Sequence, residues 1–165
     1  MPTTLPVPVV FRLPEGWSPA DPDKVGAPGV AFAALYPELD DGFRASITID
    51  GEYRPDVASL AEIADESVQR MRELADSVEV VDRAEVGSPD APGLTQVMRF
   101  SAQAGGARRD LVQVQAYLAM LDVNTPNKRA VIRVALTATA AQTDAVIGDF
   151  QEFLGTVRPD TGAES

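Results

Sequence analysis

Carboxylates are the side chains of this sequence with the most obvious capacity for chemistry. The chain holds 25 Asp and Glu residues, no histidine and no cysteine. The missing types exclude thiol nucleophiles, disulfides, zinc sites with nitrogen or sulfur ligands and a Ser-His-Asp triad. Three acidic groups remain as candidates: Asp21 and Asp23; Asp40 and Asp41; and Glu62, Asp65 and Glu66. Nothing beside them predicts burial, so we expect solvated surface groups, with a glycosidase using two acids as the remaining enzymatic alternative.

Nucleotide-binding and calcium-binding motifs are also missing from the sequence. It contains no G-x-G-x-x-G, no G-x-x-x-x-G-K-[ST], no G-x-S-x-G and no D-x-D-x-D-G loop. Gly105 and Gly106 lie between two strand-like runs, where a hairpin turn explains them. We therefore predict a protein that is not an enzyme and that has no cofactor and no metal site.

Polar side chains on one face of the predicted sheet are the best candidate binding site. Gln113, Gln115 and Tyr117 alternate with apolar residues along one run, so they point to the same side. Neighbouring runs add Arg133 and Thr137, and Arg44, Ser46 and Thr48, on the equivalent face. One interpretation is a half-solvated sheet face. The other is a groove in which amides, hydroxyls and rings meet a peptide or helix.

Trp17, the only tryptophan, ends the stretch VVFRLPEGW at residues 9–17. The apolar alternation over 7–13 predicts the first strand of the sheet, which Pro14 ends because proline has no N–H to donate. A long Pro- and Gly-rich connection follows over 14–29. We expect the Trp17 ring to pin this connection onto the core, with the indole N–H donating to a backbone carbonyl. A ring that faces a ligand or partner is the alternative.

Apolar runs of strand length predict seven strands. They cover 7–13, 30–36, 43–50, 78–86, 94–102, 109–121 and 129–139. Turn residues such as PELDDG and GSPDAPG separate consecutive runs, which is typical of hairpins. The sequence thus predicts a mainly antiparallel sheet of about six to seven strands.

Two amphipathic helices are predicted, one over 55–74 and one over 139–157. In the first, apolar residues recur every three or four positions as far as Met71 and Leu74, and Asp56 or Ser59 could cap its start. In the second, Thr139 and Gln142 fit a capping box ahead of an apolar face. Helices that interrupt antiparallel hairpins indicate an α+β fold with the helices covering a curved sheet. We expect one domain over 1–165, with an ordered core at 7–157 and a flexible tail at 158–165.

Charge limits the classes of partner. The formal net charge is −11, and an acidic surface repels phosphate backbones and anionic lipid. Nucleic acid is therefore disfavoured, and a basic peptide or basic partner face is favoured. The N-terminus lacks the basic and apolar regions of a signal peptide, and no window has the length of a membrane span. A cytoplasmic location is expected, and a homodimer through an edge strand remains open.

Three short motifs carry a family resemblance. They are Leu13-Pro14-x-Gly16-Trp17, the run Phe43-Arg44-Ala45-Ser46-Ile47-Thr48-Ile49 ahead of a long helix, and the ending Thr156-Val157-Arg158-Pro159. Together they make the chain similar to the PsbP-like superfamily, which includes the Ran-binding Mog proteins, the DcrB group and the actinobacterial LpqN/LpqT lipoproteins. The LpqN/LpqT branch looks most similar, and the likeness runs over nearly the whole chain.

This resemblance implies an α/β/α sandwich around an antiparallel sheet and a non-catalytic interaction role. DcrB-like relatives include chaperones of secretion effectors that shelter apolar helices on the sheet face. The chain lacks the export signal and the lipid-bearing cysteine of LpqN-type proteins, which favours an intracellular adaptor or secretion-linked chaperone. A protein that binds a small ligand or lipid, as the LpqN type implies, is the alternative function.

Overall fold

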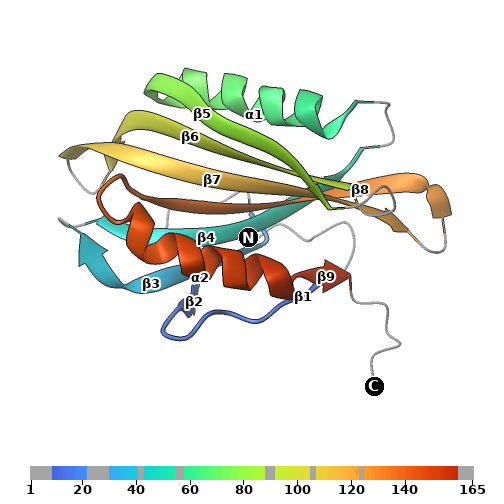
Figure 1. The fold of residues 1–165 in the computed structure, drawn as a ribbon, viewed down its shortest axis with the longest axis horizontal. Coiled ribbons are helices and arrows are strands. Elements are labelled where there is room, and N and C mark those ends of the chain that lie inside the picture. The colour runs from blue at the N-terminus through green and yellow to red at the C-terminus, as the bar shows by residue number, and fades with distance from the viewer. Residues whose placement is uncertain are drawn as a thin grey trace.

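A computed structural model describes residues 9–21, 30–40, 43–54, 58–87, 92–104, 107–122 and 125–159. Seven strands form one antiparallel sheet in the order β2-β3-β4-β8-β7-β6-β5. Their bounds are β2 Ser18–Ala20, β3 Phe32–Asp40, β4 Phe43–Tyr53, β5 Asp76–Gly87, β6 Pro92–Ala104, β7 Ala107–Asp122 and β8 Thr125–Thr139. Figure 1 shows the helices α1 (Leu60–Leu74) and α2 (Thr143–Thr156) on opposite sides of this sheet. The predicted α+β class is confirmed.

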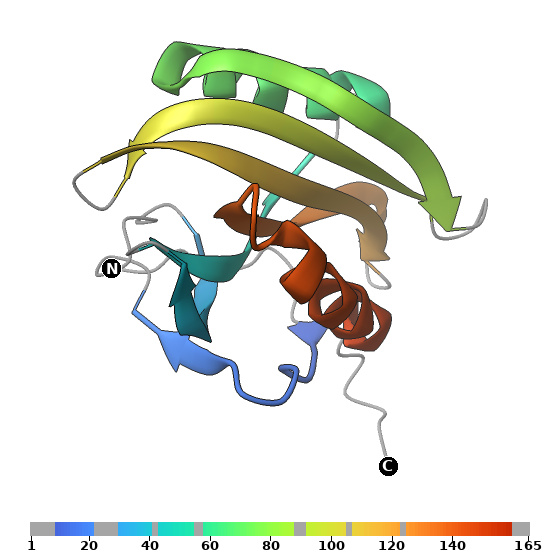
Figure 2. The same cartoon turned by 60° about the vertical axis from the view of Figure 1, so that its left-hand side comes forward.

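The sheet is strongly curved, and its longest strands bend over the molecule (Figure 2). Alternation along β7 divides the residues between the two faces. Val112 and Val114 belong to the main core with α2, whereas Leu111 and Tyr117 pack in two smaller clusters with α1. The pairing Gln113↔Thr137 and Gln115↔Ala135 carries the same division onto β8. Because a one-residue slip would exchange the two faces, this register fixes which polar groups share a surface.

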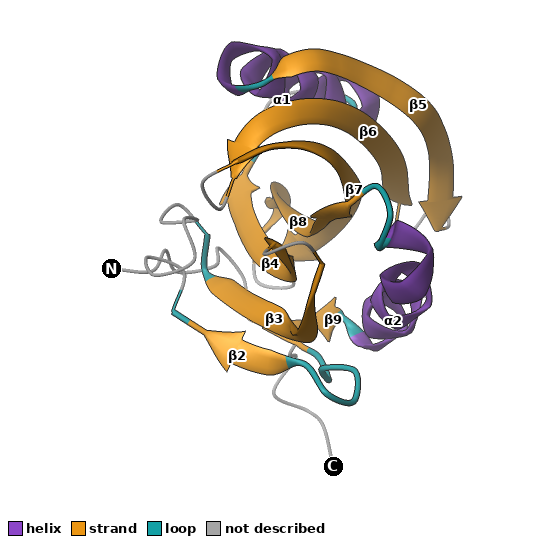
Figure 3. Cartoon of the chain, turned by 90° about the vertical axis from the view of Figure 1, so that its left-hand side faces the viewer, coloured by secondary structure: helices purple, strands orange, loops and turns teal. Residues whose placement is uncertain are grey.

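Helix α1 begins at a complete capping box. The Ser59 side chain accepts from the Glu62 N–H, and the Glu62 carboxylate accepts from the Ser59 N–H, both at 3.1 Å. Only Ile63, Ala64, Ser67 and Val68 of this helix are buried. They face β5, β6 and β7, so α1 covers one half of the sheet face. Figure 3 shows α1 over these strands and α2 on the other side of the sheet.

Helix α2 closes the main core on the opposite face. Val146, Phe150 and Phe153 are fully buried against residues of β4 and β8 such as Ile47 and Val134. The helix begins at Thr143, four residues after the predicted start, because Thr139 is still the last residue of β8. The predicted capping box is therefore wrong, although the Thr139 hydroxyl does accept from the Gln142 N–H at 3.2 Å.

The N-terminal run does not join the main sheet, contrary to the prediction. Its strand, β1, covers only Val9–Val10 and pairs with β9 (Arg158–Pro159) in a separate two-stranded sheet. Pro8 and Pro14 bracket this run and cannot donate to a ladder, which limits its length. Arg158 and Pro159 thus pair with β1, whereas the sequence placed them in a tail, and residues 160–165 lie outside the described part. The long connection contains a short strand of its own, β2, and residues 22–29 of it are not described.

Candidate functional site

A groove lies between α1 and the half of the sheet face that α1 leaves uncovered. Its volume is about 460 Å³. The floor comes from β4, β8 and β7, and the wall from the last turns of α1. The residues that line it include Ser46, Thr48, Arg70, Met71, Leu74, Leu111, Gln113, Gln115, Arg133, Ala135 and Thr137. Side chains that the alternation pattern placed on one face therefore surround one hollow.

The polar groups on the floor of the groove are uncharged apart from Arg133. Gln113 donates through Nε2 to the Thr137 hydroxyl at 3.0 Å, and Gln115 donates through Nε2 to Gln113 Oε1 at 2.6 Å. Gln113, Thr137 and Thr48 are half-buried, so parts of these amides and hydroxyls remain open to an occupant. Such groups can be covered by a partner at a smaller desolvation cost than charges would require.

The series of hydrogen-bonded polar side chains continues beneath α1 into the interior. Gln96 donates through Nε2 to Gln115 Oε1 at 2.8 Å and to the Ala64 carbonyl of α1 at 3.2 Å. The Tyr117 hydroxyl lies 2.5 Å from Ser67 Oγ and 2.8 Å from Gln115 Oε1. Burial raises the pKa of Tyr117 above its ordinary value. These side chains attach α1 to the sheet through hydrogen bonds as well as apolar packing.

Arg133 and Asp50 form an ion pair at one end of the groove. Arg133 donates to both carboxylate oxygens of Asp50, at 3.1 and 2.6 Å, and to Ser67 Oγ at 3.1 Å. Burial raises the pKa of Asp50, and the Arg133 guanidinium offsets only part of that effect. Burial opposes the charge of Arg133, but Asp50 and Tyr117 together outweigh burial and raise the pKa of Arg133. The pair also lines a neighbouring hollow of about 250 Å³.

Helix α1 provides one wall of the groove. This wall is apolar at the C-terminal end of the helix and carries a cation one turn earlier. Leu74 is 82% exposed, which is unusual for a leucine that ends an apolar stripe. Met71 and Leu111 pack in the small cluster next to it. Arg70 is exposed one turn earlier and donates through Nη2 to Ser67 Oγ at 3.0 Å. The apolar spacing of Met71 and Leu74 is that of core residues, so no sequence signal predicts that they line the edge of a groove.

The structure brings together five of the eight predicted site residues and separates three. Gln113, Gln115, Arg133, Thr137 and Thr48 line the groove, although Gln115 is only 2% exposed. Tyr117 is equally buried under α1 and lines the hollow beyond Arg133. Arg44 lies apart and donates to the carbonyls of Tyr36 and Pro37 at 2.8 and 3.0 Å.

Trp17 lies in the main core on the α2 side of the sheet. It is 6% exposed, and its ring centroid is 5.2 Å from that of Tyr36. The expected role as a core anchor is confirmed. The expected backbone partner is wrong, because the indole N–H donates to Oδ2 of Asp149 on α2 at 3.0 Å. Trp17 therefore does not face the groove.

The candidate carboxylates have structural partners where the structure describes them. Glu62 caps α1, Asp65 pairs with Arg83 at 2.8 Å, and Glu66 pairs with Arg54 at 2.9 Å. Asp21 is exposed, whereas Asp23, Asp41 and the side chain of Asp40 lie outside the described part.

Asp50 and Glu52 are two acids that line the smaller hollow together. Glu52 pairs with Arg54 at 3.0 Å, and Asp50 pairs with Arg133. Within the described residues, no group of Asp and Glu is arranged to hold a metal ion. Neither described helix is long and apolar enough to cross a bilayer.

Solved structures share this fold at low sequence identity. LpqN of Mycobacterium tuberculosis, described as involved in cell envelope biogenesis, has a TM-score of 0.63 and 11% identity over 93% of this chain and 86% of its own. The Ran-binding protein Mog1p of Saccharomyces cerevisiae has a TM-score of 0.59 and 17% identity, over 95% of this chain and 93% of its own. Cyanobacterial PsbP from Synechocystis sp. PCC 6803 has a TM-score of 0.57 and 14% identity, over 92% of this chain and 86% of its own.

Comparison at the sequence level adds no closer relative. No protein-family model matches the chain, and no curated protein matches it. The structural likeness shows that the chain has the fold of PsbP, Mog1p and LpqN. The three TM-scores lie close together, so the particular likeness to the LpqN/LpqT branch stays a prediction.

Proposed function

We propose that this chain is a non-catalytic protein-binding module that receives a partner in the groove between α1 and the β4–β8 half of the sheet. One observation carries the proposal. The groove combines an apolar edge at Leu74 and Met71 with uncharged hydrogen-bonding groups on its floor, and an exposed leucine beside open amides suits contact with another protein. The Ran-binding description of Mog1p, which has the same fold, supports a protein partner by analogy.

The finer reading is an adaptor or secretion-linked chaperone that shelters an apolar helix of its partner. The apolar side chains of Met71 and Leu74 along the α1 wall of the groove support a helix with an apolar stripe as the occupant. The absence of histidine and cysteine and the ion pairs of Asp50 and Glu52 support a non-catalytic role. A cytoplasmic location remains part of this proposal.

Differential capture tests the proposal. The wild type and two variants, Thr137→Trp and Glu152→Trp, would be used to capture partners from the native host, with identification by mass spectrometry. Thr137→Trp fills the groove, whereas Glu152 is exposed on α2 at the opposite face, so Glu152→Trp controls for an added indole. We expect a partner that the wild type and Glu152→Trp retain and Thr137→Trp loses. Equal capture by the wild type and both variants would contradict the assignment to the groove.

A further inference from the structure

The charge of the groove is opposite to the charge of the chain. The formal net charge is −11, yet the described residues that line the groove include Arg70 and Arg133 and no Asp or Glu. A basic partner, which the net charge favours, would meet these guanidinium groups. An occupant that carries a carboxylate complements them instead.

Only one of the two arginines is available for such a carboxylate. Arg133 already donates to both oxygens of Asp50. Arg70 has no carboxylate partner among the residues that the structure describes, and its guanidinium donates to Ser67 Oγ. Asp50 lies close enough to feel the charge of Arg70, but its oxygens are occupied by Arg133. Arg70 therefore offers unused donors at the wall of the groove.

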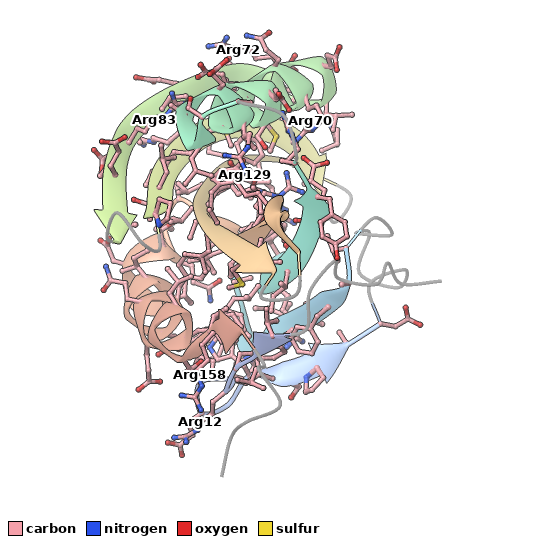
Figure 4. The ribbon with its side chains drawn as sticks, turned by 90° about the vertical axis from the view of Figure 1, so that its right-hand side faces the viewer. Arg12, Arg70, Arg72, Arg83, Arg129 and Arg158 are labelled. Carbon is pink, nitrogen blue, oxygen red and sulfur yellow. The ribbon has the colours of Figure 1, made fainter. Side chains whose placement is uncertain are left out.

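The direction of Arg70 fits this role. Figure 4 shows Arg70 on one flank of α1 and Arg83 on the other. Arg83 is occupied, since it donates to Gln96 Oε1 and pairs with Asp65. Arg72 borders the hollow on the Arg83 side and does not line the groove. The same helix thus provides a matched cation that is close in sequence and outside the groove.

The backbone of the floor restricts the conformation of the occupant. β4, β8 and β7 are interior strands, each paired on both sides, so their N–H and C=O groups are used within the sheet. An extended peptide gains backbone bonds at a sheet edge, which this groove does not offer. A helix needs none, because its backbone groups are paired internally.

We infer that the groove binds an amphipathic helix of a partner protein through an apolar stripe that contains one acidic residue, and that Arg70 pairs with that carboxylate. The inference rests on the proposed function and specifies its partner. The apolar stripe packs against Met71, Leu74 and Leu111, and the carboxylate lies beside Arg70, one turn before Leu74 on α1. Arg70 is then the residue that selects an acidic helix over a basic one.

A displayed library of helical peptides tests this inference. The library would keep an amphipathic scaffold and randomise its apolar face and flanks, and it would be panned in parallel on wild type, Arg70→Gln, Arg72→Gln and Thr137→Trp. Thermal melting would confirm that each variant is folded, and Thr48→Trp would replace Thr137→Trp if that variant were not. Chosen peptides would be remade with Gln at the acidic position for binding titrations.

We expect peptides from wild type and Arg72→Gln to carry Asp or Glu at one fixed position, and those from Arg70→Gln to lack this preference. Replacing that acid by Gln should weaken binding to wild type about two- to fivefold, as for a partly exposed ion pair, and leave binding to Arg70→Gln unchanged. Groove-dependent peptides with no acidic preference would overturn the inference and leave the proposed function standing. No peptide whose binding is lost in Thr137→Trp would overturn both.

Discussion

Trp17 joins three parts of the chain at the scale of one residue. Its ring packs in the main core beside Tyr36, and its N–H reaches Asp149 on α2. The turn that precedes it is closed by the Trp17 N–H donating to the Pro14 carbonyl at 3.2 Å, and Gly16 supplies a φ of +92° there. A positive φ favours glycine, so LPEGW is a turn built to place this ring.

Trp17→Ala should lower the free energy of unfolding by about 3–5 kcal/mol, because it removes a buried aromatic ring and leaves a cavity. Asp149→Ala should cost about 1 kcal/mol, since only the hydrogen bond to the indole is lost. Urea unfolding measures both. Partner capture should persist in Trp17→Ala wherever it is folded, because Trp17 lies on the other face of the sheet. A cost below about 1 kcal/mol would contradict a core role.

Asp50 should give the stability a distinctive pH dependence. Its folded pKa is raised by burial above the unfolded value, so the folded state takes up this proton first as the pH falls. The cost of burying the charged carboxylate is then present above the folded pKa and disappears as the pH falls toward the unfolded value. The stability of the wild type relative to Asp50→Asn should therefore rise on acidification from pH 7. Melting temperatures of both proteins across this range measure it, and a relative fall would mean that Arg133 lowers the pKa.

At the scale of elements, α1 is held by less apolar packing than α2. Of its four buried residues, Ile63, Ala64 and Val68 pack in two small apolar clusters. The fourth, Ser67, accepts a hydrogen bond from the Tyr117 hydroxyl beneath the helix. The stability of α1 on the sheet depends on each buried amide beneath it keeping its hydrogen-bond partner. Leaving a buried polar group unsatisfied costs more free energy than a hydrogen bond contributes.

Gln115→Leu should lower the free energy of unfolding by about 1–3 kcal/mol, because it deprives Gln96 and the Tyr117 hydroxyl of an acceptor. Thr137→Val is the matched control on the same face of the sheet. It removes only the acceptor of Gln113 Nε2, and Gln113 is half-buried and can turn to water, so we expect a smaller loss. Urea unfolding of both variants tests this order. Equal losses of unfolding free energy would contradict the division of the sheet face into a half that α1 covers and a half that lines the groove.

The edge strand β5 should resist pairing with a second copy. Glu79, Asp82 and Glu85 are exposed on it, and two shifts interrupt its register with β6. Like charges and bulges are devices that keep sheet edges apart. We expect sedimentation velocity to show a monomer at micromolar concentration, and Glu79→Gln combined with Asp82→Asn and Glu85→Gln to increase self-association. A wild-type dimer unaffected by these changes would point to another interface.

At the scale of the whole molecule, local pattern predicts the sheet but not its coverage. The alternation along 109–121 and 129–139 places Gln113 and Thr137 on one face because side-chain direction has a period of two in a strand. The same alternation could not show that α1 covers Gln115 and Tyr117 and leaves Thr48 and Thr137 open, since both halves of the face read alike. The pairing of β1 with β9 joins residues from opposite ends of the chain, and no local signal specifies it.

The helix stripe illustrates the same limit. Its spacing marks Ile63, Met71 and Leu74 equally, and only the position of α1 on the sheet buries the first and exposes the last. Arg70 lies beside this stripe, and its spacing alone does not predict that it lines a groove. The groove thus depends on where α1 lies on the sheet. The fold, and not the sequence pattern, shows that Arg70 lines its wall.

Site-specific crosslinking tests the central claim, that a partner protein occupies the groove, most directly. A photoreactive residue would be introduced as Leu74→p-benzoylphenylalanine and, separately, as Glu152→p-benzoylphenylalanine, and each protein would be irradiated in the native host. Both positions are exposed, so neither change disturbs the core. We expect a discrete crosslinked protein from position 74, lost when Thr137→Trp is added, and none from position 152. Crosslinks that form from position 152, or that survive Thr137→Trp, would contradict it.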